Sequence, residues 1–142
     1  MNGREHILKA ISTNKPTFIA APELTIDRPV ISDLNLLNFY IQKLESIGGK
    51  AIVVNGYDYI KTDIEQSGRE GGWIVNTIPE AGDTDKNLNE LQDATALETV
   101  HKAYIRGTIG VAENGAVWVK ESQAINRLLP FICQHLVLVI NA

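Results

Sequence analysis

The stretch Ile109-Gly-Val-Ala-Glu-Asn-Gly-Ala-Val-Trp-Val119 decides the fold prediction for this chain. Asn114-Gly115 stands between two apolar runs, and these residue types tolerate the positive φ angles of a two-residue hairpin turn at the least cost. The pattern therefore predicts an antiparallel β-hairpin, which we place at about residues 103–121. In this register Glu113 ends the incoming strand and lies opposite Ala116.

Side chains in the predicted hairpin alternate between two faces, and both faces are mostly apolar. The first face comprises Ile109, Val111, Glu113, Ala116 and Trp118, and the second comprises Gly110, Ala112, Val117 and Val119. We therefore expect the hairpin to be covered on both sides. Glu113 would then be partly desolvated at the rim, which favours its neutral form and makes it a candidate general acid, base or nucleophile. The alternative is a solvated residue ahead of a turn.

The composition predicts one globular domain spanning residues 1–142, with a core of ordinary size. Hydrophobic residues make up 44% of the chain and charged residues 21%, as in soluble proteins. The net charge of -4 gives no electrostatic support for a nucleic-acid or anionic-membrane partner. We find neither a signal-peptide pattern nor an apolar run long enough to cross a bilayer, so we expect no membrane insertion and a cytoplasmic location.

Cysteine and histidine usage predicts no metal site. Cys133 is the only cysteine, which excludes an internal disulfide and any iron–sulfur or zinc site built from cysteines of this chain alone. The three histidines, His6, His101 and His135, are far apart and show no metal-ligand spacing. If electrons move in the pathway of this protein, another subunit carries them.

The first part of the chain predicts two helices joined by an extended connection. Residues 4–12 form a short amphipathic pattern, and residues 13–31 hold three prolines without regular periodicity. This helix and connection make up an N-terminal region of about residues 1–30. Ser32 is expected to cap a helix over residues 34–47, which Gly48 would end in a left-handed conformation.

Apolar periodicity also places the later elements. They are a buried strand at 51–54, a helix at 57–67, a strand at 73–78, a polar loop at 79–87, a weak helix at 88–97, a connection at 122–127, a turn at 128–130 and a buried strand at 136–140. Strands that alternate with helices indicate an α/β layer. A helix would be expected after the last strand, so another subunit is one candidate to cover that face, and a homo-oligomer is a candidate assembly.

A second candidate ligand site is the glycine-rich segment that follows the 57–67 helix. Gly71 and Gly72 could expose backbone N–H groups to an anion, and Arg69 adds positive charge. The alternative is a plain connection from helix to strand. Gly107-Thr-Ile-Gly110 lacks the lysine of a P-loop, so its glycines are better explained by close packing within a strand.

Several fragments resemble one known family. They are Phe39-x4-Leu44-x3-Gly48-Gly49, Gly110-Val-Ala-Glu-Asn-Gly-Ala-Val117, Leu128-Leu-Pro130 and the strand Leu136–Ile140. These resemble the lactate-utilisation (LUD) domain family over roughly residues 30–140. The resemblance implies a three-layer α/β/α sandwich with a mixed, mostly parallel sheet, like that of sugar-phosphate isomerases, deaminases and CoA transferases. The family's final helical segment has no counterpart in this sequence.

The resemblance also implies a function. It predicts a part in the oxidation of lactate to pyruvate beside iron–sulfur partner subunits, with no cofactor bound by this chain itself. Ala112-Glu-Asn-Gly115 is similar to the Ser-Glu-Asn-Gly motif of CoA transferases, whose glutamate is the nucleophile. This similarity implies a second alternative, a small-molecule enzyme of the CoA-transferase and sugar-phosphate isomerase superfamily. In that enzyme Glu113 would be the catalytic nucleophile or base, and Asn114, Gly115 and Gly110 would bind a small-molecule ligand such as CoA or a phosphate. A third alternative is a non-catalytic structural subunit.

Overall fold

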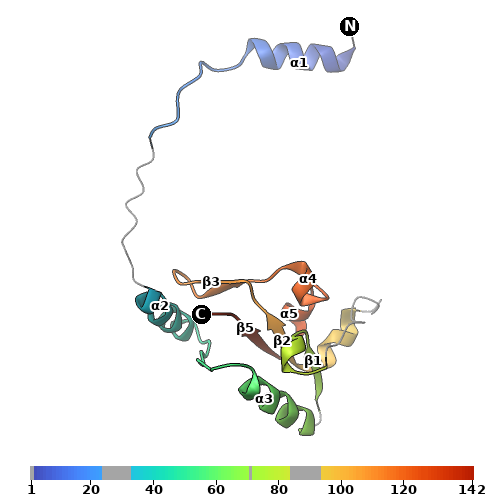
Figure 1. Ribbon diagram of the computed structural model, residues 1–142. Helices are drawn as coiled ribbons and strands as arrows, with labels where there is room; N and C mark the ends of the chain where they lie inside the picture. The colour runs from blue at the N-terminus through green and yellow to red at the C-terminus, as the bar shows by residue number, and fades with distance from the viewer. Residues whose placement is uncertain (1, 24–32, 71, 84–93) are drawn as a thin grey trace. The chain divides into compact units, whose positions relative to one another are not determined.

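The computed structural model describes residues 2–23, 33–70, 72–83 and 94–142 (Figure 1). The chain divides into two units, residues 1–30 and residues 31–142, which we describe separately. None of the described helices has the length and apolar character needed to span a membrane.

The N-terminal unit contains helix α1 (Gly3–Thr13), which confirms the helix predicted at residues 4–12. Its first turn is closed by a capping box, because the Asn2 side chain accepts a hydrogen bond from Arg4 N and the Glu5 carboxylate accepts one from Asn2 N. Residues 14–23 have no regular secondary structure, as predicted for the extended connection. The remainder of that connection, from residue 24, lies outside the described residues.

The second unit is built on a three-stranded parallel sheet. Strands β1 (Trp73–Asn76), β2 (Val100–Arg106) and β5 (His135–Val139) lie in the order β1-β2-β5. The strands predicted at 73–78 and 136–140 are thereby confirmed. The start of the predicted hairpin is wrong, because residues 103–106 belong to the central strand. β5 is an edge strand with exposed and half-buried side chains, so its prediction as a fully buried strand is also wrong.

Helices lie on both faces of this sheet (Figure 1). On one face α3 (Asp58–Arg69) contributes Ile60 to a core with Ile78 and Tyr104. The other face is covered by η3 (Ala94–Thr99), α4 (Glu121–Ala124) and α5 (Leu129–Ile132), whose core with the sheet comprises Val75, Leu97, Val100, Ala103, Ile105 and Leu129. The α/β class with a mostly parallel sheet is confirmed, and the superfamily stays a prediction.

The hairpin follows β2 and consists of β3 (Ile109–Val111) and β4 (Ala116–Trp118). Val111 pairs with Ala116, so the loop has four residues, and the predicted two-residue turn with Glu113 opposite Ala116 is wrong. Within this loop Gly115 has a positive φ of 74° and Asn114 does not. Instead, the Asn114 side-chain oxygen accepts a hydrogen bond from Ala116 N at 3.0 Å, which closes the longer loop.

One face of the hairpin is open, which corrects the prediction that both are covered. Ile109, Val111 and Trp118 share this face and are 59%, 38% and 65% exposed. The opposite face packs on helix α2 (Asp33–Ser46) and on the end of the last strand. A methyl group at Gly110 would lie 2.9 Å from Ile140 and 3.1 Å from the Tyr40 ring. The four-residue loop keeps the predicted alternation of faces but shifts the pairing by two residues.

Helix α2 confirms the predicted helix at 34–47, and Gly48 ends it with a φ of 89°. The expected cap, Ser32, lies outside the described residues. Residues 51–54 form no strand, and Ile52 and Val53 are exposed, so the predicted buried strand is wrong. β-branched residues favour a pleated surface only where a neighbouring strand accepts them, and none of the described strands pairs with this segment.

The remaining predictions are confirmed in part. Helix α3 confirms the helix predicted at 57–67, and η1 (Pro79–Ala81) is a single turn inside the predicted polar loop. Of the weak helix predicted at 88–97, residues 88–93 lie outside the described residues and the rest belong to η3. The predicted connection and turn at 122–130 contain the short helices α4 and α5, because the apolar residues Ala124 and Leu129 are buried against the sheet.

Candidate functional site

Three polar side chains alternate along the central strand. Lys102, Tyr104 and Arg106 face α3, because side chains two residues apart in a strand share a face. Central strands of parallel sheets are usually apolar on both faces, so this polar face needs partners. The partners come from α3 and from the loops next to it, and they form two clusters.

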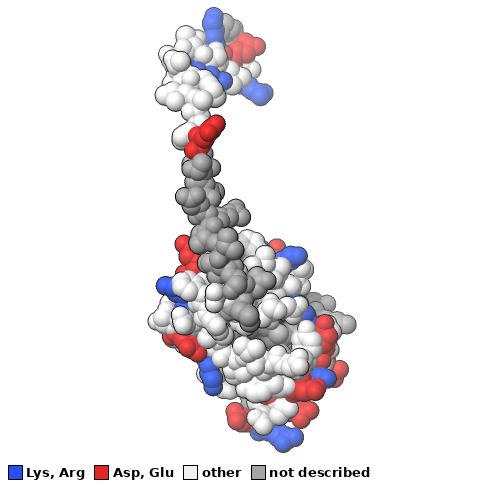
Figure 2. All heavy atoms as spheres, turned by 60° about the vertical axis from the view of Figure 1, so that its left-hand side comes forward, with Lys and Arg blue, Asp and Glu red and all other residues white. Residues whose placement is uncertain are grey.

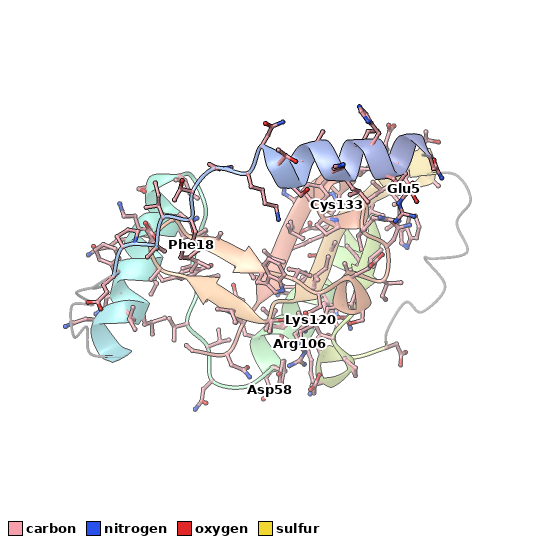
Figure 3. The ribbon with its side chains drawn as sticks, turned by 90° about the horizontal axis from the view of Figure 1, so that it is seen from above. Glu5, Phe18, Asp58, Arg106, Lys120 and Cys133 are labelled. Atoms are coloured by element: carbon pink, nitrogen blue, oxygen red, sulfur yellow. The ribbon has the colours of Figure 1, made fainter. Side chains whose placement is uncertain are left out.

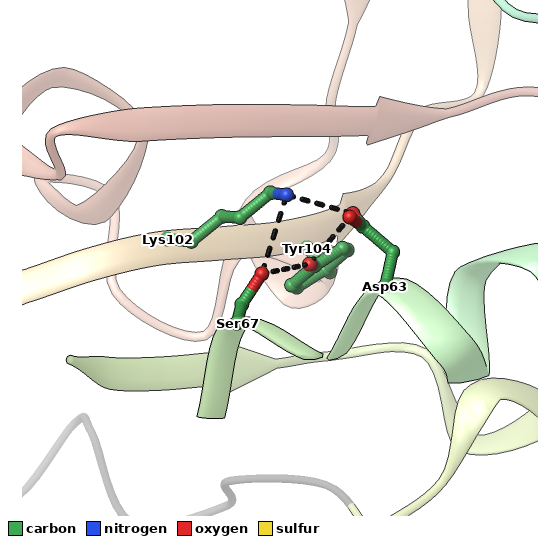
Figure 4. Close-up of polar contacts among 4 residues, drawn as sticks. All are labelled: Asp63, Ser67, Lys102 and Tyr104. Atoms are coloured by element: carbon green, nitrogen blue, oxygen red, sulfur yellow. Dashed lines mark hydrogen bonds and ion pairs between the residues drawn. The ribbon is translucent and has the colours of Figure 1, made fainter. Parts of the chain in front are cut away.

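The first cluster comprises Asp63, Ser67, Lys102 and Tyr104 (Figure 4). Asp63 Oδ2 accepts hydrogen bonds from Lys102 Nζ at 2.7 Å and from Tyr104 OH at 2.8 Å. The hydroxyl of Ser67 lies 3.4 Å from Lys102 Nζ and 3.3 Å from Tyr104 OH. Tyr104 is fully buried and Ser67 is nearly so. The polar atoms between α3 and β2 therefore satisfy one another.

The ionisation of this cluster favours a structural role. Burial alone would raise the pKa of Asp63, but hydrogen bonds from Lys102 and Tyr104 and the charge of Lys102 lower it. Burial alone would lower the pKa of Lys102, but its hydrogen bonds and the charge of Asp63 raise it. A serine–lysine nucleophile needs a neutral lysine as its base. The protonated Lys102 is therefore better suited to join α3 to the sheet than to activate Ser67.

The second cluster lies at the carboxyl edge of the sheet. Arg106, labelled in Figure 3, is the last residue of β2, and its side chain contacts Tyr57, which immediately precedes α3. Its guanidinium donates a hydrogen bond to Tyr57 OH at 3.2 Å and lies over the Tyr57 ring, 5.7 Å from the centroid. A second nitrogen pairs with the carboxylate of Glu80 in η1. The hydrogen bond to Tyr57 and the charge of Glu80 raise the pKa of Arg106 further.

The loop that carries Glu80 is held by a buried side chain. Asn76, at the end of β1, is 3% exposed. Its amide nitrogen donates hydrogen bonds to the carbonyl oxygens of Ile78 and Asp83, at 3.1 and 3.0 Å, and its oxygen accepts one from Ile78 N at 2.9 Å. The backbone on both sides of Glu80 is therefore fixed to the sheet, and Glu80 projects from a positioned turn.

This edge is where parallel α/β sheets bind their ligands, because the loops beyond the strand ends converge there. A guanidinium at that edge matches the geometry of a carboxylate or a phosphate. On the face of residues 31–142 seen in Figure 2, acidic and basic side chains are interspersed around a largely uncharged middle.

Of the residues predicted around the hairpin, two are exposed and two pack against other elements. Glu113 and Asn114 are exposed on the loop, so the predicted desolvation of Glu113 is wrong. Gly115 is buried, and a methyl group there would lie 3.1 Å from Leu44 Cα. Gly110 contacts Tyr40 and the end of the chain's last strand rather than an open surface. The proposed catalytic role of Glu113 stays a prediction.

The predicted glycine-rich anion loop lies at the other end of the sheet. Arg69 ends α3, its side chain is 79% exposed, and it lies 3.9 Å from the carboxylate of Glu65. Gly72 packs on His101, since a methyl group at Gly72 would lie 2.3 Å from His101 Cβ. Gly71 lies outside the described residues. This segment precedes the start of β1, whereas the hairpin follows the end of β2. Because the two strands are parallel, the glycine-rich loop and the hairpin lie at opposite ends of the sheet and do not form one site.

Two of the histidines meet in space. The rings of His101 and His135 are 5.0 Å apart between centroids, because the parallel register places β5 beside the start of β2. The fold thus brings together two histidines that are far apart in the sequence. Among the residues that the structure describes, no group of three or more metal-binding side chains is found.

Sequence reasoning missed Arg106 and Tyr57. The signal was present, because Lys102, Tyr104 and Arg106 alternate with apolar residues as in a half-covered strand. When the chain was compared with models of protein families, with curated proteins and with solved structures, nothing matched.

Proposed function

We propose that residues 31–142 bind a small anionic ligand at the carboxyl edge of the sheet, with Arg106 as the residue that holds its carboxylate or phosphate group. The observation that supports this most is the position of Arg106 as the last residue of the central parallel strand, with 28% of its side chain exposed. The cation thus stands at the edge where α/β domains bind ligands and remains accessible from solvent.

Among the described residues, Tyr57 and Glu80 leave N–H donors of Arg106 available for such a ligand. A guanidinium carries five N–H groups, whereas the hydrogen bonds to Tyr57 and Glu80 engage two of its nitrogens with one partner each. Stacking on Tyr57 holds the guanidinium plane in place. A positioned cation with free donors loses little side-chain entropy when it binds an anion.

The resemblance to the lactate-utilisation family supports a more specific form of this proposal. Lactate is a carboxylate, and a role beside iron–sulfur subunits agrees with a chain whose only cysteine is Cys133. We propose lactate utilisation as the pathway in which the ligand is bound. Deletion of the gene should then impair growth on lactate, and normal growth would argue against this pathway without touching the binding proposal.

The binding proposal is tested by calorimetry and thermal unfolding with L-lactate, pyruvate, inorganic phosphate and CoA. A ligand that binds only the folded state at about 100 times its Kd should stabilise it by about 2.7 kcal/mol. Arg106→Gln should remove this effect. Arg127→Gln is the matched control, since Arg127 is 81% exposed and lies 4.0 Å from Glu121. Equal binding by wild type and Arg106→Gln would overturn the proposal.

The same panel separates the alternatives derived from the sequence. Arg69→Gln should leave binding unchanged if Arg106 is the anion partner, and should abolish it if the predicted glycine-rich loop is the site. Glu113→Gln tests the enzymatic alternative, which requires loss of turnover with ligand binding retained. Binding of none of the four compounds would favour the non-catalytic structural subunit.

A further inference from the structure

We infer that Glu80 is a built-in competitor of the ligand: its carboxylate holds one guanidinium nitrogen of Arg106 in the free protein, and it leaves when the anion of the ligand takes two parallel N–H···O bonds that include this nitrogen. This inference rests on the proposed function of Arg106. It assigns to Glu80 a role in setting the affinity of the site.

Glu80 is chemically similar to the proposed ligand. The carboxylate of Glu80 is itself the kind of group for which Arg106 is proposed, and it contacts one guanidinium nitrogen through a single oxygen, Oε2. Carboxylates bind guanidinium most strongly when two parallel N–H···O bonds form. A free ligand has no backbone tether and can adopt that two-pronged geometry, so it can replace the single contact of Glu80.

Glu80 can leave without disturbing the fold. Its side chain is 51% exposed, so water can solvate the released carboxylate. The backbone of η1 stays fixed, because Ile78 and Ala81 are buried on either side and Asn76 holds the loop by three hydrogen bonds. Displacement therefore needs only a rotation of the Glu80 side chain.

Arg106 stays in place after Glu80 leaves. The contacts with Tyr57, a hydrogen bond at 3.2 Å and the stacked ring, come from the start of α3 and not from the loop of Glu80. The cation is therefore positioned by one partner and neutralised by another. This separation lets Glu80 set the affinity without setting the geometry of the site.

The test is calorimetric titration of the full chain with inorganic phosphate and, separately, with L-lactate. The variants are Glu80→Gln, Arg106→Gln and Glu121→Gln, the last being an exposed carboxylate in a long surface pair with Arg127. Exposed ion pairs contribute little, so Glu80→Gln should lower the Kd about three- to fivefold. Glu121→Gln should leave the Kd unchanged. Unfolding temperatures of the variants confirm that each one is folded.

The outcomes separate the two proposals. If Arg106→Gln abolishes binding but Glu80→Gln leaves the Kd unchanged or raises it, Glu80 is not a competitor while Arg106 remains the anion partner. If Arg106→Gln binds like wild type, the proposed function itself fails. Absence of binding of both probes in wild type and in Glu80→Gln overturns both proposals, since removal of the competitor should reveal the site.

Discussion

The Nζ atom of Lys102 lies 2.7 Å from Oδ2 of Asp63, so that a half-buried ion pair joins the central strand to helix α3. The pair is accompanied by Tyr104 OH, which donates to the same carboxylate oxygen. The two residues are 39 positions apart in the sequence, so the contact fixes α3 against the central strand. This contact also orients α3, whose first turn follows the Tyr57 that stacks on Arg106.

Asp63→Asn should destabilise the domain by about 1–3 kcal/mol, because it leaves the Lys102 ammonium without its counter-charge in a partly buried place. The exposed side chain of Glu65 on the same helix, 3.9 Å from Arg69, provides the matched control. Glu65→Gln should change stability by less than about 0.5 kcal/mol. Urea unfolding of the three proteins measures both effects, and equal stabilities would contradict the role of the pair.

The Asp63–Lys102 pair should also make the stability of the domain depend on pH. The folded state lowers the pKa of Asp63 relative to the unfolded chain, so its contribution is present at neutral pH and is lost as the pH falls through the ordinary range of an aspartate towards the folded pKa. Stability should therefore fall more steeply between about pH 5 and pH 3 in wild type than in Asp63→Asn. Parallel pH profiles from urea unfolding would contradict this.

Replacement of Thr77 by valine should stabilise the domain. It follows β1, and its hydroxyl oxygen is buried without a hydrogen-bond partner in the described part of the chain. A buried polar group without a partner is unfavourable, so Thr77→Val should raise the free energy of unfolding by about 1 kcal/mol. Thr62→Val in α3 is the control, since that hydroxyl already donates to Asp58 O. A loss of stability in Thr77→Val would show that the hydroxyl is paired.

Gly115 and Gly48 form a matched pair that tests the hairpin loop. Both have positive φ angles, 74° and 89°, but only Gly115 lies against another backbone, that of Leu44. Gly48→Ala should cost about 1 kcal/mol through its conformation alone. Gly115→Ala should cost more, because the new methyl group also presses on α2. Thermal unfolding compares the two, and equal losses would mean that the loop does not pack on α2.

The sequence predicted the helices α1, α2 and α3 and the strands β1 and β5 because each has a local signal in its periodicity or its caps. The central strand was misplaced because its polar face, Lys102 to Arg106, is satisfied only by tertiary partners on α3. The hairpin loop was misjudged because Asn114 uses its side chain to close a longer loop. Arg106 became a candidate only when the parallel sheet placed it at the carboxyl edge, where α/β domains bind their ligands.

The most direct test of the account is an NMR titration that follows the guanidinium Nε–H signals of the arginines while inorganic phosphate or L-lactate is added. If Arg106 holds the anion, its signal should shift and saturate, and the signals of Arg69 and Arg127 should stay in place. Chemical shifts report on the group that touches the ligand, so the result does not depend on any mutant. A saturating shift at Arg69, or an unchanged Arg106 signal while ligand binds, would contradict the account.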